Sequence, residues 1–360
     1  MMNRLTDDLV TDILSRLPIK TLTRCTCVCK LWRNIARDPR FIHSQLNSRS
    51  SQQNPSFILC TTLWFDSAFR SQIYFLEHNE TLGYTCEKVS FSIPDLKEFR
   101  SISSCNGLLC LVDRMNRDPI YICNPFTRCC TKLPIRIDPP QNIGGLVMGF
   151  GFNPTRNEYK LVEIINSSGP FMVSESTVYV YTLGDGFWRN KGNVPYVILS
   201  QQLALASSEA FLCGALHWLC LFPAKHIASF DIANELFGVI PYPEMVVDGG
   251  GGLSLVVLGG CLSIMDSSFH EHIDLWIMKD YGVKESWVKS FSIRFHLVGW
   301  DIIKYVRTLC VQGNGELLML HNNQALLSYS PRAMTLRKLR IAGLPSWFEM
   351  VNHVGSLVSL

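Results

Sequence analysis

The first fifty residues carry apolar side chains at the spacing of short amphipathic helices. A first helix is predicted up to about Leu17, since Thr6 is a good N-cap and Pro18 cannot continue a helix. Its apolar positions recur at steps of three and four: Leu9, Val10, Ile13, Leu14 and Leu17. A second helix is expected from about Ile19, and a third carries Val28, Leu31, Trp32 and Ile35. Asp38-Pro39 ends the third helix, and a last amphipathic turn follows at Phe41, Ile42 and Leu46.

A different pattern begins after the polar stretch at residues 49–56. Short runs of apolar, aromatic and β-branched residues alternate with turn residues, which is typical of an all-β domain. We therefore predict a small all-α module at residues 1–48, a linker at 49–56 and an all-β domain at 57–360. A module of about 40 residues buries little surface by itself, so it should lean on a partner.

The all-β region repeats one hairpin. In three places a turn residue is followed nine positions later by an apolar residue that closes the hairpin: Asn124 with Leu133, Asp231 with Ile240 and Ser330 with Leu339. With two variants and a weaker first copy, hairpin turns fall near residues 77, 124, 183, 231, 280 and 330, a mean period of about 50. This period predicts a β-propeller-like domain of about six blades, with one more or one fewer allowed.

A glycine-led strand precedes several of these hairpins. It recurs at residues 105–111, 213–219, 258–264 and 313–319. Because small residues let backbones approach closely, we expect these strands to be the innermost ones of their blades, near a central axis.

Three stretches of the N-terminal module follow one another in a recognisable order. They are Leu17-Pro18-Ile19-Lys20-Thr21-Leu22, Val28-Cys29-Lys30-Leu31-Trp32-Arg33 and Asp38-Pro39-Arg40-Phe41-Ile42. Together they resemble the F-box, in the form found in plants, over almost the whole module. The resemblance implies docking onto a Skp-type adaptor, which links the F-box to a cullin, a RING subunit and a ubiquitin-loaded E2 enzyme. It implies adaptor contacts at Leu5, Leu9, Ile13, Leu17, Pro18, Val28, Cys29 and Trp32.

Other interpretations of the module stay open at single positions. Thr6 stands where F-box proteins usually have proline, and this change either lowers adaptor affinity or leaves it unaltered. The module's own core should take Leu14, Leu31 and Ile35, while Trp32 serves both core and contact. Basic residues on one face of the third helix would also suit a DNA-recognition helix: Lys30, Arg33 and Arg37. The segment fits the F-box at so many positions that we favour adaptor binding.

The β region has a resemblance of its own. The glycine-led strands, together with Gly149-Phe150-Gly151-Phe152-Asn153-Pro154 and Tyr159-Lys160-Leu161-Val162, resemble the F-box-associated domain of plants, a kelch-like region. This resemblance spans nearly all of the chain beyond the F-box. It implies that the chain is the substrate-recognition subunit of an SCF-type ubiquitin ligase, in which the β domain holds a target protein.

Charge and composition narrow the class of partner and the compartment. Residues 1–50 carry nine Lys and Arg against four Asp and Glu, and the remainder carries 24 against 26. The surplus suggests an acidic partner surface but is too small to demand nucleic acid. No apolar run approaches the roughly 20 residues that cross a bilayer, and no signal-peptide core is present. We expect a cytoplasmic or nuclear protein without membrane partners, whose 14 cysteines are free thiols.

No residue pattern indicates catalysis. Gly249–Gly252 lacks the Lys and Ser or Thr of a phosphate-binding loop, and His270-Glu271-His272 lacks further ligands at zinc spacing. Cys25, Cys27 and Cys29 alternate along a helix and point to different sides. His217 lies in a repeated strand and is expected to be a buried, hydrogen-bonded residue rather than a base. We therefore expect no enzyme activity, no metal and no cofactor.

Target choice is expected to rest on loops at one face of the β domain. Aromatic residues in irregular stretches are the candidate target contacts, although burial in the core is favoured for each: Phe295, Trp300, Trp347 and Phe348. A non-proteolytic kelch-like scaffold and a glycan-binding protein are the alternative functions. The sequence also predicts that residues 354–360 form a strand beside Phe57–Leu59 and close the domain, since an open edge would invite aggregation.

Overall fold

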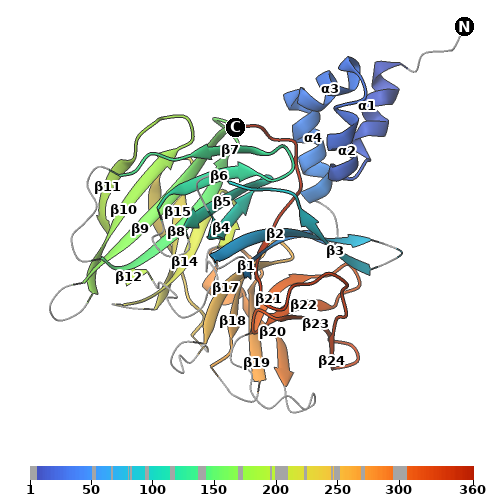
Figure 1. The fold of residues 1–360 in the computed structure, drawn as a ribbon. Helices are drawn as coiled ribbons and strands as arrows, with labels where there is room; N and C mark the ends of the chain where they lie inside the picture. The colour runs from blue at the N-terminus through green and yellow to red at the C-terminus, as the bar shows by residue number, and fades with distance from the viewer. Residues whose placement is uncertain are drawn as a thin grey trace, which may run out of the picture. The chain divides into compact units, whose positions relative to one another are not determined.

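The structure, a computed structural model, contains a helical module followed by an all-β domain (Figure 1). It describes residues 6–360 apart from 51–53, 66–67, 80, 82, 94–96, 114–117, 137–142, 169–172, 195–196, 199–209, 223–224, 245, 247–251, 269–271 and 295–305. The chain folds into two compact units. The first comprises Met1–Leu133, Ile341–Leu344 and Met350–Leu360, and the second comprises Pro134–Arg340 and Pro345–Glu349.

Four helices form the N-terminal module: α1 (Asp7–Ser15), α2 (Ile19–Cys25), α3 (Lys30–Arg37) and α4 (Pro39–Ser50). Thr6 is the N-cap residue of α1, although its side chain makes no capping hydrogen bond. The fourth helix is longer than the single turn that the sequence pattern predicted. Pro39 starts it without loss, because the first N–H of a helix has no partner within the helix, and Asp38 Oδ1 accepts the N–H of Arg40 at 2.8 Å. None of the described helices is long and apolar enough to cross a membrane.

The core of the helical module is continuous with the core of the neighbouring sheets in the first unit. Val10 and Leu14 of α1 and Ile19 of α2 are buried in one apolar cluster with Phe75 and Leu109 of the β domain. Part of the apolar surface of this small module is therefore buried against the sheets of its own chain.

Six antiparallel sheets make the β domain a six-bladed β-propeller, as the repeat predicted. In the first unit, sheet one consists of β25 (Glu349–Asn352), β1 (Phe57–Phe65), β2 (Ala68–Asn79) and β3 (Gly83–Val89). Sheet two consists of β4 (Phe99–Cys105), β5 (Leu108–Asp113), β6 (Ile120–Asn124) and β7 (Cys129–Lys132).

The second unit holds the other four sheets, again in sequence order. Sheet three is β8 (Ile143–Asn153), β9 (Glu158–Ser168), β10 (Val173–Thr182) and β11 (Arg189–Val194). In sheet four, β12 (Val197–Ile198) and β13 (Ala210–Leu212) both pair with the second strand, β14 (Ala215–Phe222), which is followed by β15 (His226–Asp231) and β16 (Leu236–Ile240). Sheet five is β17 (Leu253–Leu258), β18 (Cys261–Asp266), β19 (His272–Met278) and β20 (Trp287–Arg294), with the short helix η1 (Lys284–Ser286) before β20. Sheet six is β21 (Val306–Val311), β22 (Leu317–His321), β23 (Ala325–Ser330) and β24 (Thr335–Lys338).

The repeated hairpin joins the third and fourth strands of a sheet, and its turn explains the repeat. Asn124 Oδ1 accepts the N–H groups of Phe126 at 2.9 Å and Thr127 at 3.3 Å, and Asp231 Oδ1 accepts the N–H of Asn234 at 2.7 Å. The residue four positions after the capping residue is left-handed in each turn: Arg128 at φ 62°, Glu235 at 58° and Met334 at 52°. A short polar side chain is therefore required at the start of the turn.

The glycine-led strands are not innermost, and this prediction was wrong. They are β5, β14, β18 and β22, each the second strand of its sheet. The small residues form the tight turn before the strand, since Asn106 and Gly107 have φ of 49° and 82°. Two successive left-handed residues make the hairpin turn whose twist matches that of the strands, which is why glycine recurs there.

The C-terminal part of the chain closes sheet one, but through a strand upstream of the predicted one. β25 pairs with β1, so the first and last strands of the β domain share a sheet. Residues 353–360 form no strand. They are nevertheless partly buried, and His353, Ser356 and Leu357 are 2%, 0% and 6% exposed. We refer to residues 353–358 as the C-terminal segment.

Acid is expected to destabilise the folded chain through His353. Burial lowers the pKa of His353 to about 3, below the 6.5 of an unperturbed histidine. Between these values only the unfolded state binds the proton, so stability is full above about pH 6.5 and falls as the pH drops toward 3. We expect a loss of about 1.4 kcal/mol per pH unit in this range.

Urea unfolding at pH 7 and pH 5.5 measures this loss. His353→Asn should unfold more easily at pH 7 but show a smaller fall between the two pH values. His43→Asn, at an exposed position of α4, is the matched control and should keep the wild-type fall. An unchanged pH dependence in His353→Asn would assign the effect to other groups.

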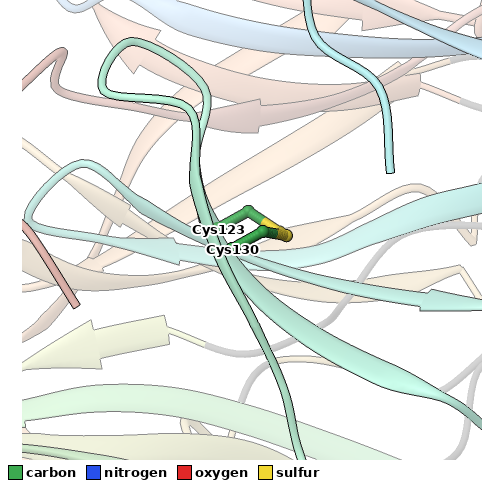
Figure 2. The surroundings of a disulfide bond; sticks show 2 residues. All are labelled: Cys123 and Cys130. Atoms are coloured by element: carbon green, nitrogen blue, oxygen red, sulfur yellow. A yellow bond between two sulfur atoms is a disulfide. The ribbon is translucent and has the colours of Figure 1, made fainter. Parts of the chain in front are cut away.

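One pair of cysteines departs from the expectation of free thiols. Cys123 on β6 and Cys130 on β7 lie directly opposite each other on neighbouring strands and are joined by a disulfide (Figure 2). Neighbouring strands place directly opposed side chains close together, a relation that the spacing of seven residues does not reveal. The other twelve cysteines form no disulfide, and six of them are buried.

Candidate functional site

The first helix exposes two large apolar side chains. Leu9 and Ile13 are 53% and 49% exposed and lie one turn apart, so they share a face of α1. Val10 and Leu14, on the buried side, are 6% and 1% exposed. Helices that bury one apolar stripe in the module's core and expose a second stripe to solvent often bind another protein.

A second exposed apolar group lies at the connection between α2 and α3. Val28 is 65% exposed and Leu31 is 39% exposed, and Cys29 between them is exposed as well. The backbone at Cys29, the N-cap of α3, is extended, with φ −153° and ψ 167°. The connection between α2 and α3 therefore leaves Val28, Cys29 and Leu31 outside the module's own core.

The structure sorts the predicted adaptor contacts into three groups. Five are exposed: Leu9, Ile13, Pro18, Val28 and Cys29. Leu17 and Trp32 are partly buried and pack against the core cluster, and Leu5 lies outside the described residues. The prediction that Leu31 belongs to the core was wrong, because its side chain is exposed. Leu14 and Leu31 occupy similar positions in the periodic pattern, and only their surroundings distinguish them.

Basic side chains accompany the exposed apolar ones. Exposed positions on α2 and α3 include Arg24, Lys30, Arg33 and Arg37. Arg33 Nε also donates to the carbonyl of Thr26 at 2.9 Å, which closes the end of α2 and holds α3 beside it. A binding partner that is apolar at its centre and acidic at its rim would complement such a surface.

In the β domain, strand order sends two kinds of connection to opposite ends of each sheet. The turns between first and second strands and between third and fourth strands lie at one end. The turns between second and third strands and the connections to the next sheet lie at the other end. Among the described residues, these connections to the next sheet include a long loop at residues 339–348. Long loops on a rigid scaffold are the usual place for target recognition.

The predicted target contacts have different outcomes. Phe348 is fully buried, so it is part of the core and cannot contact a target. Trp347 beside it is partly exposed. Phe295 and Trp300 lie outside the described residues. Phe348 shows why an irregular backbone is a poor guide to exposure, since its N–H binds the carbonyl of Asn323 at 2.7 Å and draws the loop into the fold.

An exposed aromatic pair was missed by the sequence reasoning. Trp64 on β1 and Phe69 on β2 are 62% and 47% exposed. They are opposed in the strand register and contact each other edge to face, with ring centroids 4.6 Å apart. They lie near the end of β1 and the start of β2, the second and third strands of sheet one. Aromatic residues on both sides of a polar pair, Asp66-Ser67, were the available signal.

Titratable groups of the second unit that could suggest catalysis have structural roles. His217 is fully buried, its Nδ1 lies 2.9 Å from the carbonyl of Ala210 and its Nε2 lies 2.6 Å from Tyr281 Oη. Burial lowers the pKa of His217, so the ring is neutral. Burial likewise raises the pKa of Cys220 and of Cys310 to about 12, which keeps both thiols protonated and unreactive.

A buried carboxylate, Glu235, is also fully engaged. Lys160 Nζ lies 2.8 Å from one of its oxygens, and Arg189 and Lys191 contact the other at 2.7 and 3.2 Å. Burial favours the neutral acid, but the three cations outweigh it and lower the pKa of Glu235 to about 2. The Glu235 carboxylate therefore stabilises the fold and stays ionised near neutral pH. Within the described part of the chain, no cluster of His, Cys, Asp and Glu could hold a metal ion.

Comparison with known proteins agrees with this architecture. Residues 2–44 match the F-box domain, and residues 62–358 match the F-box associated beta propeller domain. The F-box protein At3g07870 of Arabidopsis thaliana is 34% identical, with 98% of this chain and 91% of the relative covered. The F-box protein CPR1 of the same plant is 27% identical over 98% of this chain and 88% of its own length.

A small helical module joined to a β-propeller is an architecture typical of non-catalytic adaptor subunits. The chain belongs to the family of plant F-box proteins with an F-box-associated β-propeller domain.

Proposed function

We propose that this chain is the substrate-recognition subunit of an SCF-type ubiquitin ligase, acting in the cytoplasm or nucleus. The F-box module docks onto a Skp-type adaptor, which connects it to a cullin-RING complex, and the propeller holds a target protein. The observation that carries this proposal is the set of exposed apolar side chains on a module whose sequence is that of an F-box: Leu9, Ile13, Val28 and Leu31.

The mechanism is one of positioning. A target held on the propeller is brought close to the ubiquitin-loaded E2 enzyme, which raises the effective concentration of the reacting groups. The chemistry of ubiquitin transfer belongs to the other subunits. This division of labour agrees with the burial of His217, Cys220, Cys310 and Glu235 in the fold.

The adaptor and the target protein are proposed to bind different surfaces of the chain. Adaptor contacts are proposed at Leu5, Leu9, Ile13, Leu17, Pro18, Val28, Cys29 and Trp32, with Leu31 added because it is exposed. Target contacts are proposed in the first unit at Trp64 and Phe69, which form an exposed pair, and separately in the second unit at Trp347, which is partly exposed. Aromatic side chains are frequent energetic anchors of protein interfaces.

Reconstitution tests the proposal directly. The purified full-length chain is mixed with a plant Skp-type adaptor, a cullin and a RING subunit, and the mixture is separated by size-exclusion chromatography. We expect one complex that contains all four proteins. Binding of the adaptor without entry into the cullin complex would favour the non-proteolytic scaffold, and no binding of the adaptor would refute the F-box role.

A further inference from the structure

The C-terminal segment lies against the tight-turn end of sheet two and is held there by several hydrogen bonds. Asn124 Nδ2 donates to the carbonyls of Ser356 and Val358 at 3.0 and 2.8 Å. Ser356 Oγ donates to the carbonyl of Asn106 at 2.8 Å. These hydrogen bonds join the segment to the β4–β5 turn and to the β6–β7 turn, which lie at the same end of sheet two. The chain end lies near β7 (Figure 1).

The other side of the segment contacts the F-box module. A side-chain carbon added at Gly355 would lie 2.7 Å from Cγ2 of Ile19 on α2 and 3.2 Å from Cε2 of Phe126. Only a hydrogen atom fits in this space, so Gly355 is in direct contact with the helix. Ile19 is fully buried at this point, and Leu357 joins the same apolar cluster.

Helix α2 is held on a second side by sheet one. Lys20 Nζ donates to Glu87 Oε2 on β3 at 2.6 Å and lies 5.4 Å from the ring centre of Phe75 on β2. The Lys20 ammonium lowers the pKa of Glu87, as expected for a close ion pair. The helix therefore contacts both sheet one and the C-terminal segment, and Phe126 of the β6–β7 turn packs against the same apolar cluster.

We propose that the C-terminal segment is a positioning element, with Gly355 as its central residue, which holds the F-box in one orientation on sheets one and two. Because β25 pairs with β1, the residues that follow β25 are placed in contact with α2. On the proposed function of the chain, this joint sets the direction from which a bound target approaches the adaptor.

Carbodiimide cross-linking of the full-length protein tests the joint, because it couples a lysine to a carboxylate only where the two are in contact. The Lys20–Glu87 product, measured by mass spectrometry, reports the seating of α2. In Gly355→Ala the added methyl group must displace Ile19, and we expect the yield to fall about 5-fold or more. The Lys284–Glu244 pair of the second unit is the internal control and should keep its yield.

A second substitution separates positioning from general loss of stability. Ile19→Ala removes the atom that the new methyl group meets, so Gly355→Ala should change the Lys20–Glu87 yield much less in that background. Ser356→Ala loses the bond to the carbonyl of Asn106 and the bond that Ser356 Oγ accepts from the N–H of Val358. It serves if Gly355→Ala does not fold, and it should lower the yield more mildly. Thr21→Ala, on the exposed side of α2, should leave the yield unchanged.

Adaptor binding, measured separately by chromatography, distinguishes this inference from the proposed function. A variant with a lowered Lys20–Glu87 yield and intact adaptor binding would support a positioning role. Equal Lys20–Glu87 yields in the wild type, Gly355→Ala and Ser356→Ala would overturn the inference. So would a parallel fall of the Lys284–Glu244 product, since it would indicate loss of the whole fold.

Discussion

A chain that ends at Phe348 is expected to be insoluble. Such a truncation removes β25 and leaves the edge of β1 open along a strand whose first residues, Phe57, Ile58 and Leu59, are fully buried in the intact protein. An unpaired apolar edge is a template for aggregation. The yield of soluble protein tests this expectation. The melting temperature of any soluble fraction is measured by circular dichroism.

Two further truncations make this prediction specific. A chain that ends at Asn352 keeps β25 but loses the burial of His353 and Leu357 and the partners of Asn124, and we expect it to lose about 5 kcal/mol or more of stability. That loss is comparable with the whole stability of many domains. A chain that ends at Val358 lacks only the exposed Ser359 and Leu360 and should melt like the full protein. If the chain that ends at Phe348 also melted like the full protein, closure by β25 would be wrong.

Placing a charge on the exposed apolar face of the F-box is expected to abolish adaptor binding without unfolding the module. Leu9→Asp and Val28→Asp change side chains that are 53% and 65% exposed, so the expected effect on stability is within about 0.5 kcal/mol. An interface that buries either aspartate without a partner would lose about 100-fold or more in affinity. Binding to a Skp-type adaptor by calorimetry, beside the helical signal of each variant, measures both quantities.

Asn34→Asp is the matched control, because it adds the same charge at an exposed position of α3 with almost no change of shape. It should bind like the wild type. Trp32→Ala is less informative, since Trp32 packs against the core and its loss would damage fold and contact together. Wild-type affinity in both Leu9→Asp and Val28→Asp would show that the adaptor binds elsewhere, or not at all.

Local chemistry made much of the fold predictable. The helices of the module follow from the spacing of apolar residues and from Pro18, which no helix interior accepts. The six blades follow from turns that need a particular residue at a particular place. Asn124 and Asp231 cap their turns through side-chain oxygens, and the left-handed residue four positions later completes the hairpin, so each turn leaves the same trace in the sequence.

The errors concern relations between distant parts of the chain. The glycine-led strands were placed innermost because glycine permits close approach, whereas Gly107 serves a left-handed turn. Both uses of glycine look alike in a sequence. The strand that closes the domain was placed at residues 354–360, although β25 ends at Asn352, because pairing with β1 depends on a register that apolar content alone does not define.

The sequence by itself determined the class of each part: a helical module that resembles the F-box, with the adaptor contacts that this resemblance implies, and a propeller-like domain of about six blades. Only the tertiary structure decided which apolar positions of the module are exposed, so that Leu31 faces solvent while Leu14 is buried. It also decided that the C-terminal segment meets α2 at Gly355. Periodicity and turn chemistry act between near neighbours and are written locally, whereas burial and contact depend on which distant surfaces the closed chain brings together.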